Sequence, residues 1–227
     1  MASSRELPSD CKLEELEKYK KTLQRLSEPI ISNNGRDYEY IDTDVKYGKK
    51  KFYVEVLDYE FVAAAVTSVK SYNSNERNEV TCTGTVDENL INVENVNMKK
   101  TIGKGNCTKA VAYLIKTLML EAKKRGSCNS FPHEGTVYIA SKNGCSAANC
   151  YIKAFMLNGF DYDKEELKKL VKKIEVKNGN VNYKLNFKNK KQEQEQKRIT
   201  TTTRKRKREL LHEELPLNAQ RIIQLKF

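Results

Sequence analysis

The chain has 227 residues, of which 38% are hydrophobic and 32% are charged, and its formal net charge is +12. This length suits one folded domain with extensions. No apolar run reaches the length of a membrane span and the N-terminus lacks a signal-peptide core, so the sequence argues against membrane association and predicts an intracellular protein.

A surface helix is predicted near the N-terminus, after an arm formed by residues 1–8. Residues 8–10 (Pro-Ser-Asp) are a helix-start signal, and Pro29 is a stop signal. The apolar positions between them are Leu13, Leu16, Tyr19, Leu23 and Leu26. The other face of this helix is almost entirely charged, which favours a solvent-exposed helix over a partner-binding one. We assign residues 1–28 to an N-terminal arm and helix.

Strand-like segments follow in close succession. They lie at residues 38–45, 52–57, 61–69, 79–86 and 90–98. Residues 61–69 are continuously apolar, which predicts a central strand, and a polar connection follows them. A run of strands followed by alternating helix and strand predicts an α+β fold, with a mixed, mostly antiparallel central sheet flanked by helices.

Residues 99–126 contain a glycine-rich turn followed by the longest clearly amphipathic helix that the sequence predicts. Gly103 and Gly105 allow the backbone to approach a ligand closely. Apolar residues recur with the helical period at positions 107, 110, 111, 114, 115, 118 and 122, and Gly126 ends the helix. A strand, a glycine turn and a helix N-terminus form an anion site, because unpaired N–H groups and the positive end of the helix dipole meet there.

The glycine turn fits neither of two common nucleotide-binding motifs. It lacks the spacing of a P-loop, and Thr108 stands where the dinucleotide fingerprint has its third glycine. The segment Lys100-Thr101-Ile102-Gly103-Lys104-Gly105 instead resembles the acyl-CoA pyrophosphate loop of the GNAT superfamily of N-acetyltransferases. That loop reads Gln/Arg-x-x-Gly-x-Gly/Ala and lies between the fourth strand of the family and a long helix. Here a lysine takes its first position.

The segments downstream resemble the same family in the same order. Residues 136–140 predict the fifth strand, and a second helix with apolar positions 147, 150, 151, 154 and 155 ends at Asn158-Gly159. The second signature of the family is an Asn, an Ala, a helix Tyr and a closing Gly-Phe. The residues of this chain that resemble this signature are Asn143, Ala147 or Ala148, Tyr151 and Gly159-Phe160. The resemblance covers roughly residues 50–187 and is firmest from 90 to 160.

The resemblance implies a three-layer, GNAT-like acyltransferase domain over residues 29–187. One departure concerns the acceptor side. The family usually inserts two helices between its first and second strands, whereas the early helix of this chain precedes every strand. The binding of the acceptor is therefore left open by the sequence.

Acetyl-CoA is the co-substrate that the resemblance implies, without a metal. Its pyrophosphate would rest on backbone N–H groups of residues 102–106, beside Lys100 and Lys104, and its pantetheine arm would pair with the strand edge at residues 96–98. The candidate cofactor-binding residues are Val96, Asn97, Met98, Lys100, Thr101, Ile102, Gly103, Lys104, Gly105, Asn106 and Asn143.

The reaction implied by the resemblance is direct attack of a primary amine on the thioester. Glu88 and Glu94 flank or lie on the fourth strand, where some family members carry a general base, and a surface role is the alternative for each. In the family, a helix tyrosine four residues before the closing Gly-Phe protonates the leaving thiolate. Phe155 occupies that position here, so Tyr151, one turn earlier on the same face, is the candidate acid, and a core aromatic is its alternative role.

The cysteines and histidines do not suggest a metal centre. Six cysteines form no Cys-x-x-Cys pair, and the chain has two histidines, of which His133 is interpreted as structural or surface. Three of the cysteines lie on predicted helix faces or in strands, where a small hydrophobe fits, and a reducing intracellular compartment is the simplest interpretation.

The C-terminal part divides into the end of the domain and a basic tail. Residues 164–173 predict a helix, and residues 174–176 and 181–187 predict a hairpin that closes the domain. From Lys188 to Arg208 the chain has ten Lys or Arg against two Glu and no apolar period, which predicts a mostly disordered tail over residues 188–227. Residues 210–227 contain leucines and isoleucines that could dock as a short helix.

The cluster Arg204, Lys205, Arg206, Lys207 and Arg208 has three interpretations. It resembles a nuclear-import signal, which would place the protein in the nucleus and not the cytoplasm. It could equally contact nucleic acid phosphates, or be a solvated run of charge.

Three functions remain open from the sequence. The first is an N-acetyltransferase acting on an amine of a protein or peptide, and the second is a related enzyme acting on a small-molecule amine. The third is a non-catalytic nucleic-acid-binding or regulatory protein that uses the fold and the basic tail.

Overall fold

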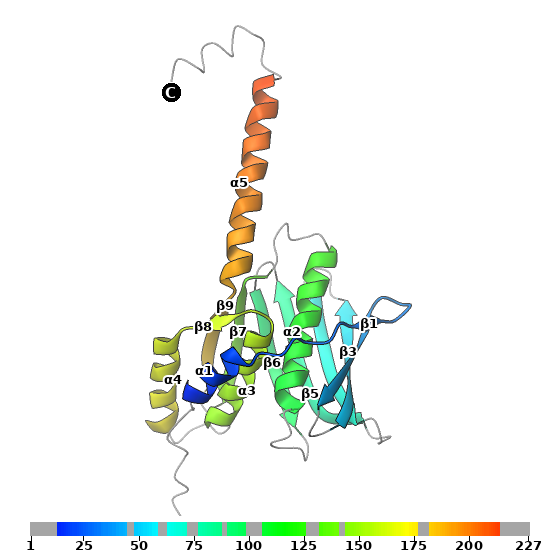
Figure 1. Ribbon diagram of the computed structural model, residues 1–227, viewed down its shortest axis with the longest axis vertical. Helices are drawn as coiled ribbons and strands as arrows, with labels where there is room; N and C mark the ends of the chain where they lie inside the picture. The colour runs from blue at the N-terminus through cyan, green and yellow to red at the C-terminus, as the bar shows by residue number, and fades with distance from the viewer. Residues whose placement is uncertain are drawn as a thin grey trace, which may run out of the picture.

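The computed structural model describes residues 13–44, 48–58, 63–71, 77–87, 90–98, 106–125, 132–140, 144–176 and 182–213. The elements in chain order are α1 (Leu13–Lys21), β1 (Ile30–Ile31), β2 (Asp37–Asp44), β3 (Gly48–Asp58), β4 (Ala63–Ser71), β5 (Arg77–Asp87), β6 (Leu90–Met98), α2 (Asn106–Arg125), β7 (Glu134–Ala140), α3 (Gly144–Leu157), β8 (Asp161–Tyr162), α4 (Lys164–Val176), β9 (Asn182–Lys188) and α5 (Lys190–Glu213). The strands form one sheet in the order β1-β2-β3-β4-β5-β6-β7-β9-β8. Figure 1 shows α2 and α3 packed against the same face of this sheet.

Strands β1 to β6 form an antiparallel meander. On β3, Phe52, Val54 and Val56 are buried, while the alternating residues Lys49 and Glu55 are exposed. This period of two gives the sheet an apolar face toward α2 and a polar face away from it. The apolar segment predicted to be central is β4, which lies between β3 and β5.

The second part of the sheet contains a parallel pair. The chain passes from β6 through α2 to β7, and this crossover makes the two strands parallel. Strand β9 then enters between β7 and β8 and pairs antiparallel with both. Its residues Leu185 and Phe187 are buried, and the Phe187 ring stacks on Phe155 of α3 at a centroid distance of 4.0 Å.

Helix α2 is the central element of the core. Its predicted apolar face is confirmed, because positions 110, 111, 114, 115, 118 and 122 are buried. Tyr113 stacks on Tyr40 of β2 at 4.3 Å between ring centroids, and the hydroxyls of Tyr40 and Thr117 lie 2.7 Å apart. Helix α3 joins this core and ends at Leu157, directly before the predicted stop at Asn158-Gly159, where the φ of 83° at Gly159 is the left-handed conformation typical of a residue that follows a helix.

Helix α1 is shorter than the sequence predicts. It ends at Lys21, where the backbone N–H of Thr22 donates to the carbonyl of Tyr19 at 3.0 Å. The chain then runs without regular structure across α2 (Figure 1), where Nζ of Lys116 donates to the Ser27 carbonyl at 2.9 Å. Contacts with α2 therefore override the helical pattern: Leu26 is buried, but Leu23 is 40% exposed.

One further prediction about the fold is corrected. Residues 174–176 continue α4 and do not form a hairpin strand with β9, because β9 finds its partners in β7 and β8. The α+β fold with a mixed, mostly antiparallel sheet is found as predicted, and over the meander the described helices lie on one face, while Lys49 and Glu55 of the other face are exposed. The chain runs from β1 through β3 without a helix among the described residues.

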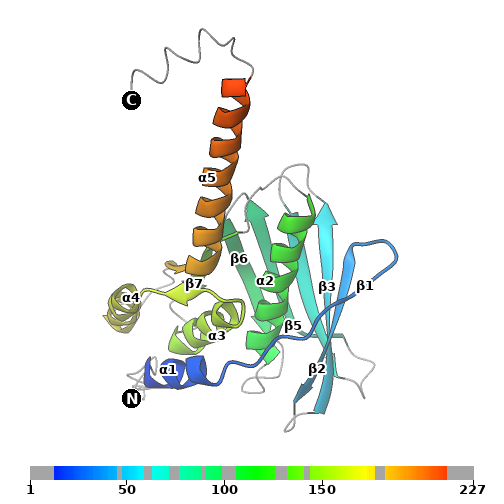
Figure 2. The same cartoon turned by 45° about the horizontal axis from the view of Figure 1, so that its top comes forward.

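The sequence predicts a mostly disordered tail, but the structure has a helix in the tail up to Glu213. Residues 190–213 form the continuous helix α5, which Figures 1 and 2 show projecting away from the body. Its first turn is anchored by Asn189, which is buried and whose Oδ1 accepts from the N–H of Gln192 at 3.3 Å. Lys197 pairs with Glu193 at 2.6 Å, and Lys, Arg, Gln and Glu favour helix even without an apolar face. Residues 214–227 lie outside the described residues, so docking of 210–227 stays a prediction.

A search of the described helices found none that combines the length and the apolar composition needed to cross a membrane.

Candidate functional site

The parallel pair β6–β7 separates along its length. The two strands pair from Leu90 with Glu134 to Val93 with Val137, and both continue beyond this point. Between the described residues 94–98 and 138–140, no pairing is found. The edge of β6 that faces β7 therefore offers backbone N–H and C=O groups to a ligand with an extended amide chain.

A β-bulge lies where the two strands separate. On the opposite edge of β6, Val93 pairs with Gly84 and Val96 with Cys82, so residues 94 and 95 together face one residue of β5. A bulge bends its strand and increases the local twist, which accounts for the divergence of β6 from β7. Glu94 lies in this bulge and is exposed to solvent.

Two buried oxygen atoms beside Glu94 have no hydrogen-bond partner among the described residues. They are Oδ1 of Asn92 and Oγ1 of Thr136, and the two residues are direct neighbours across the β6–β7 pair. The Nδ2 group of Asn92 donates to the Glu94 carboxylate at 3.4 Å. Buried acceptors without partners are rare in folded proteins, and a ligand with N–H donors would satisfy them. The separation point thus presents acceptor atoms and a carboxylate.

Tyr151 of α3 is buried on the other side of this region. Burial raises the pKa of its hydroxyl to about 12, and the neighbouring Cys82 thiol contributes in the same direction. Cys82 is the strand partner of Val96, so Tyr151 lies near the part of β6 that has separated from β7. Its hydroxyl has no hydrogen-bond partner among the described residues. At neutral pH it is a protonated donor, and both its predicted role as an acid and the role of core aromatic remain compatible with this position.

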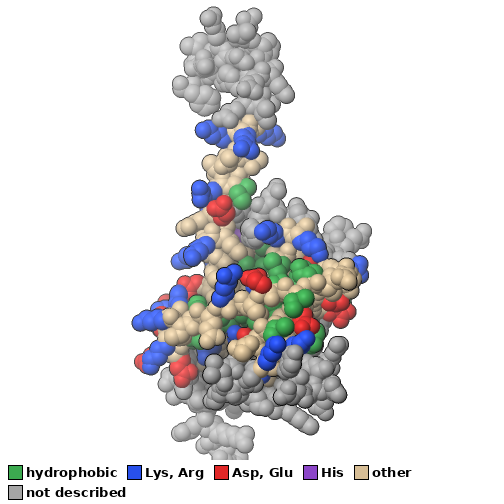
Figure 3. Space-filling model, turned by 45° about the vertical axis from the view of Figure 1, so that its right-hand side comes forward, with side chains coloured by type: hydrophobic (Ala, Val, Ile, Leu, Met, Phe, Trp, Pro, Cys, Tyr) green, Lys and Arg blue, Asp and Glu red, His purple; other side chains and the backbone are tan. Residues whose placement is uncertain are grey.

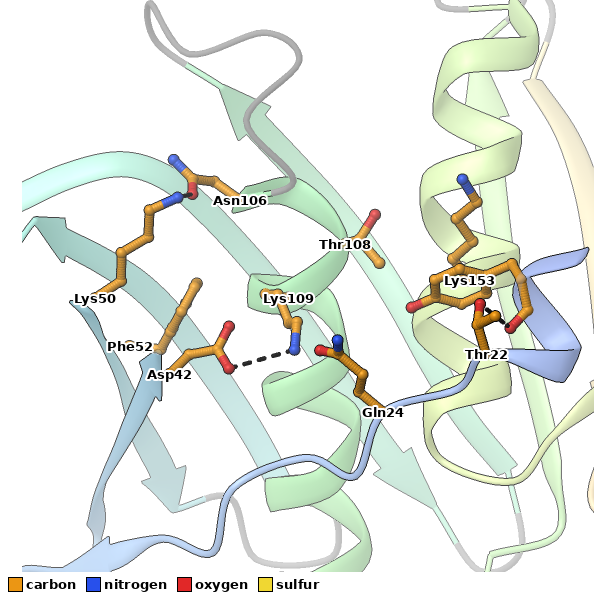
Figure 4. A pocket seen from close by; sticks show the side chains of 10 residues that line it. Thr22, Gln24, Asp42, Lys50, Phe52, Asn106, Thr108, Lys109 and Lys153 are labelled. Carbon is orange, nitrogen blue, oxygen red and sulfur yellow. Dashed lines mark hydrogen bonds and ion pairs between the residues drawn. The ribbon is translucent and has the colours of Figure 1, made fainter. Parts of the chain in front are cut away.

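A polar cavity of about 350 Å³ lies at the start of α2. Figure 4 shows its walls: the N-terminal turns of α2, strands β2 and β3, the segment after α1, and α3. Asn106, the first residue of α2, is 1% exposed, and its Oδ1 accepts a hydrogen bond from Nζ of Lys50. The cavity therefore combines a helix N-terminus with a buried cation.

Two more lysines line this cavity. Lys109 pairs with Asp42 at 3.3 Å, and Nζ of Lys153 lies 5.2 Å from the centre of the Tyr19 ring, in a cation–π contact. Three lysines against one carboxylate leave the cavity positively charged. With the positive end of the α2 dipole, this charge favours a phosphate-bearing ligand over a neutral one.

A disulfide ties the two helices together at this end. Cys107, in the first turn of α2, is bonded to Cys150 of α3, with a Cα separation of 6.3 Å. This disulfide differs from the expectation of reduced cysteines, because the pairing of residues 43 positions apart cannot be predicted from spacing alone. Cys82 fits the interpretation of a small hydrophobe, since it is outside this disulfide and fully buried in the core.

The structure places only part of the predicted site. Glu88, Lys100, Thr101, Ile102, Gly103, Lys104, Gly105 and Asn143 lie outside the described residues. Asn97 and Met98 are the last residues of β6, on the separated part of the strand, and Val96 is half-buried against the core. Tyr151 lies near Cys82, the strand partner of Val96, Glu94 lies two residues before Val96 in the bulge, and Asn106 is the first residue of α2.

Sequence reasoning missed the three lysines of the cavity. Lys50 lies between the predicted strands 38–45 and 52–57, yet it shares the alternation of Phe52, Val54 and Val56, which places its side chain on the buried face of β3. That period was a usable signal. Lys109 and Lys153 lie on helices far apart in the sequence and gave no such signal. Among the described residues, no cluster of His, Cys, Asp or Glu could hold a metal ion.

Comparisons with known proteins do not assign the chain to a family. No protein-family model and no curated protein matches the chain. A crystal structure of nourseothricin acetyltransferase is similar with a TM-score of 0.33 and 10% sequence identity, over 75% of this chain and 91% of that chain.

Proposed function

We propose that this chain is an acetyl-CoA-dependent N-acetyltransferase that acts on a primary amine. The observation that carries the proposal is the β6–β7 pair, which separates at a bulge directly before the connection to the N-terminus of α2. This arrangement offers an open strand edge and an anion site side by side. The resemblance of residues 100–105 to an acyl-CoA loop gives the same ligand independently.

Acetyl-CoA has two chemically different parts that match these two features. Its pantetheine arm contains amides and can pair with the free edge of β6 at residues 94–98, as an added strand would. Its phosphates can accept hydrogen bonds from the N-terminus of α2, with Lys50, Lys109 and Lys153 as the nearby cations. The thioester would then lie at the separation point, between Glu94 and Tyr151.

The chemistry follows from the groups at that point. The amine nitrogen of the acceptor attacks the thioester carbonyl, and the carbon–sulfur bond breaks as the new amide bond forms. Glu94, directly or through water, accepts the proton that the amine loses, and a free N–H of β6 donates to the developing oxyanion. Tyr151 donates its proton to the departing thiolate. Oδ1 of Asn92 and Oγ1 of Thr136 would accept the N–H groups of the amine.

The direct test is an acetylation assay with the full-length protein. Acetyl-CoA is incubated with lysine peptides, with peptides that have a free N-terminus, and with small di- and polyamines, and both free thiol and acetylated amine are measured. Preference for peptides or for small amines decides between the two kinds of acceptor. If acetyl-CoA binds but no amine is acetylated, the alternative of a non-catalytic regulatory protein takes the place of the enzyme.

Acetyl-CoA is expected to raise the melting midpoint of the protein, because a ligand that binds only the native state stabilises it. At a concentration 100 times its Kd the gain is about 2.7 kcal/mol, or about 5–10 °C for a domain of this size. Differential scanning fluorimetry measures it. Gly105→Glu should abolish the shift by adding bulk and negative charge to the loop. Gln194→Glu, which adds the same charge on exposed α5, should retain it. An unchanged wild-type midpoint at saturating acetyl-CoA would contradict the cofactor assignment.

Lys50→Met is expected to weaken acetyl-CoA binding by about tenfold, since it removes a buried cation at the phosphate end while keeping a side chain of similar length. Isothermal titration calorimetry measures the Kd. The matched control is Lys51→Met, one residue along β3, where the side chain points to the other face and pairs with Glu39 at 2.6 Å. Equal Kd values for the two variants would show that the cavity does not take the phosphates.

A further inference from the structure

The basic segment of α5, residues 197–208, is exposed along its whole length. Figure 3 shows Lys and Arg side chains along the part of the molecule that rises from the body. From Arg198 to Arg208 the sequence has no acidic residue, and the two glutamates nearer the body pair with Lys197 and Arg198, at 2.6 Å and 3.5 Å. Residues 204–208 thus place five consecutive cations on the exposed helix, directly before Glu209.

These cations surround the helix. Successive residues of an α-helix are turned by about 100°, so the five consecutive residues 204–208 cover its full circumference. Lys197, Arg204 and Arg208 also align along one side, at spacings of seven and four. A ligand that presents negative charge on two sides of a rod would contact all of these side chains at once.

We propose that α5 binds double-stranded DNA by lying in the major groove, with its cations on the phosphates of both groove walls. A helix about 10–12 Å in diameter fits a groove about 12 Å wide. The 24 residues of α5 span about 36 Å, close to one turn of the duplex. Contacts to phosphates carry no sequence information, so this binding depends little on the base sequence.

The composition of α5 argues against other polyanions. Single-stranded nucleic acid is held largely by stacking on aromatic rings, and residues 190–213 contain none of Phe, Tyr or Trp. The major groove of double-stranded RNA is too narrow for a helix. A helix that lies on a membrane needs an apolar face, whereas Ile199 is the only apolar residue between 190 and 208.

The test is fluorescence anisotropy with the full chain and a labelled 20-base-pair duplex of arbitrary sequence, over a range of salt concentrations. Five phosphate contacts give a slope of about −4.5 for log K against log salt concentration. The variant with Arg204, Lys205, Arg206, Lys207 and Arg208 all changed to Gln should bind at least about tenfold more weakly at 0.1 M salt and lose most of that slope. The control changes five exposed lysines of the body to Gln (Lys18, Lys21, Lys169, Lys184 and Lys188) and should bind nearly as wild type.

A second variant separates helix geometry from charge. Thr202→Pro keeps every cation but interrupts the helix, because proline cannot donate to the carbonyl of residue 198. It should weaken duplex binding several-fold, with the loss of helix followed by circular dichroism. The proposal is overturned if this variant binds as wild type, if the two five-residue variants bind equally, or if single-stranded DNA, double-stranded RNA or phosphatidylserine vesicles bind α5 more tightly than duplex DNA. These measurements need no acetyl-CoA, so they stand apart from the proposed enzymatic activity.

Discussion

Tyr151→Phe should lower the turnover number for acetyl transfer by about 10²-fold while leaving the Kd for acetyl-CoA nearly unchanged. The substitution removes only the hydroxyl, which is the proposed proton donor to the leaving thiolate. It should cost little stability, because this hydroxyl has no hydrogen-bond partner among the described residues. Steady-state kinetics with thiol detection gives the rate, and calorimetry gives the affinity.

The matched control is Tyr113→Phe on α2. That hydroxyl is also buried but lies 2.9 Å from Oγ of Ser27, so its removal should cost about 1 kcal/mol of stability and leave the turnover number unchanged. Because the pKa of Tyr151 is raised to about 12, the wild-type rate should not fall through loss of this proton as the pH rises to about 10. If the Tyr151→Phe enzyme turns over as fast as wild type, Tyr151 only packs in the core.

Gly135→Ala should destabilise the fold by about 3 kcal/mol or more, or prevent folding. A Cβ atom at Gly135 of β7 would overlap the ring of Phe155, which is fully buried and stacked on Phe187 of β9. The ring is packed between α3 and strands β7 and β9, so an added methyl group forces it out of its stacked position, and overpacking at this point is costly. Urea unfolding followed by circular dichroism measures the change in the free energy of unfolding.

A double-mutant cycle identifies the cause. Phe155→Leu alone should destabilise the protein, but in combination with Gly135→Ala it should recover at least about 1 kcal/mol relative to the sum of the single changes. Thr136→Ala, at the next position of β7, is the control and should be nearly neutral, since its hydroxyl oxygen has no partner among the described residues. Additive effects of the first two changes would mean that the ring is not what excludes a side chain at Gly135.

The sequence by itself determined the local elements. Strand β6 has the predicted bounds at residues 90–98, and α2 has the predicted buried face. Both could be predicted because the spacing of apolar residues along a strand or a helix is a property of neighbouring positions in the sequence. The order of β6, α2, β7 and α3, and the end of α3 directly before Asn158-Gly159, follow from the same local signals. The basic charge of residues 188–208 is likewise a property of composition. These features need no knowledge of which segments meet.

Only the tertiary structure decided the arrangement that forms the site. The separation of β6 from β7 depends on a bulge and on pairing between distant strands, and the cavity depends on Lys50 reaching Asn106 across 56 positions. Strand β9 pairs with β7 and not with residues 174–176 as predicted, because burial of Leu185 and Phe187 outweighs a local turn signal. The early end of α1 has the same physical reason. Burial against partners distant in the sequence contributes more free energy than local propensity, and a pattern of neighbouring residues does not identify those partners.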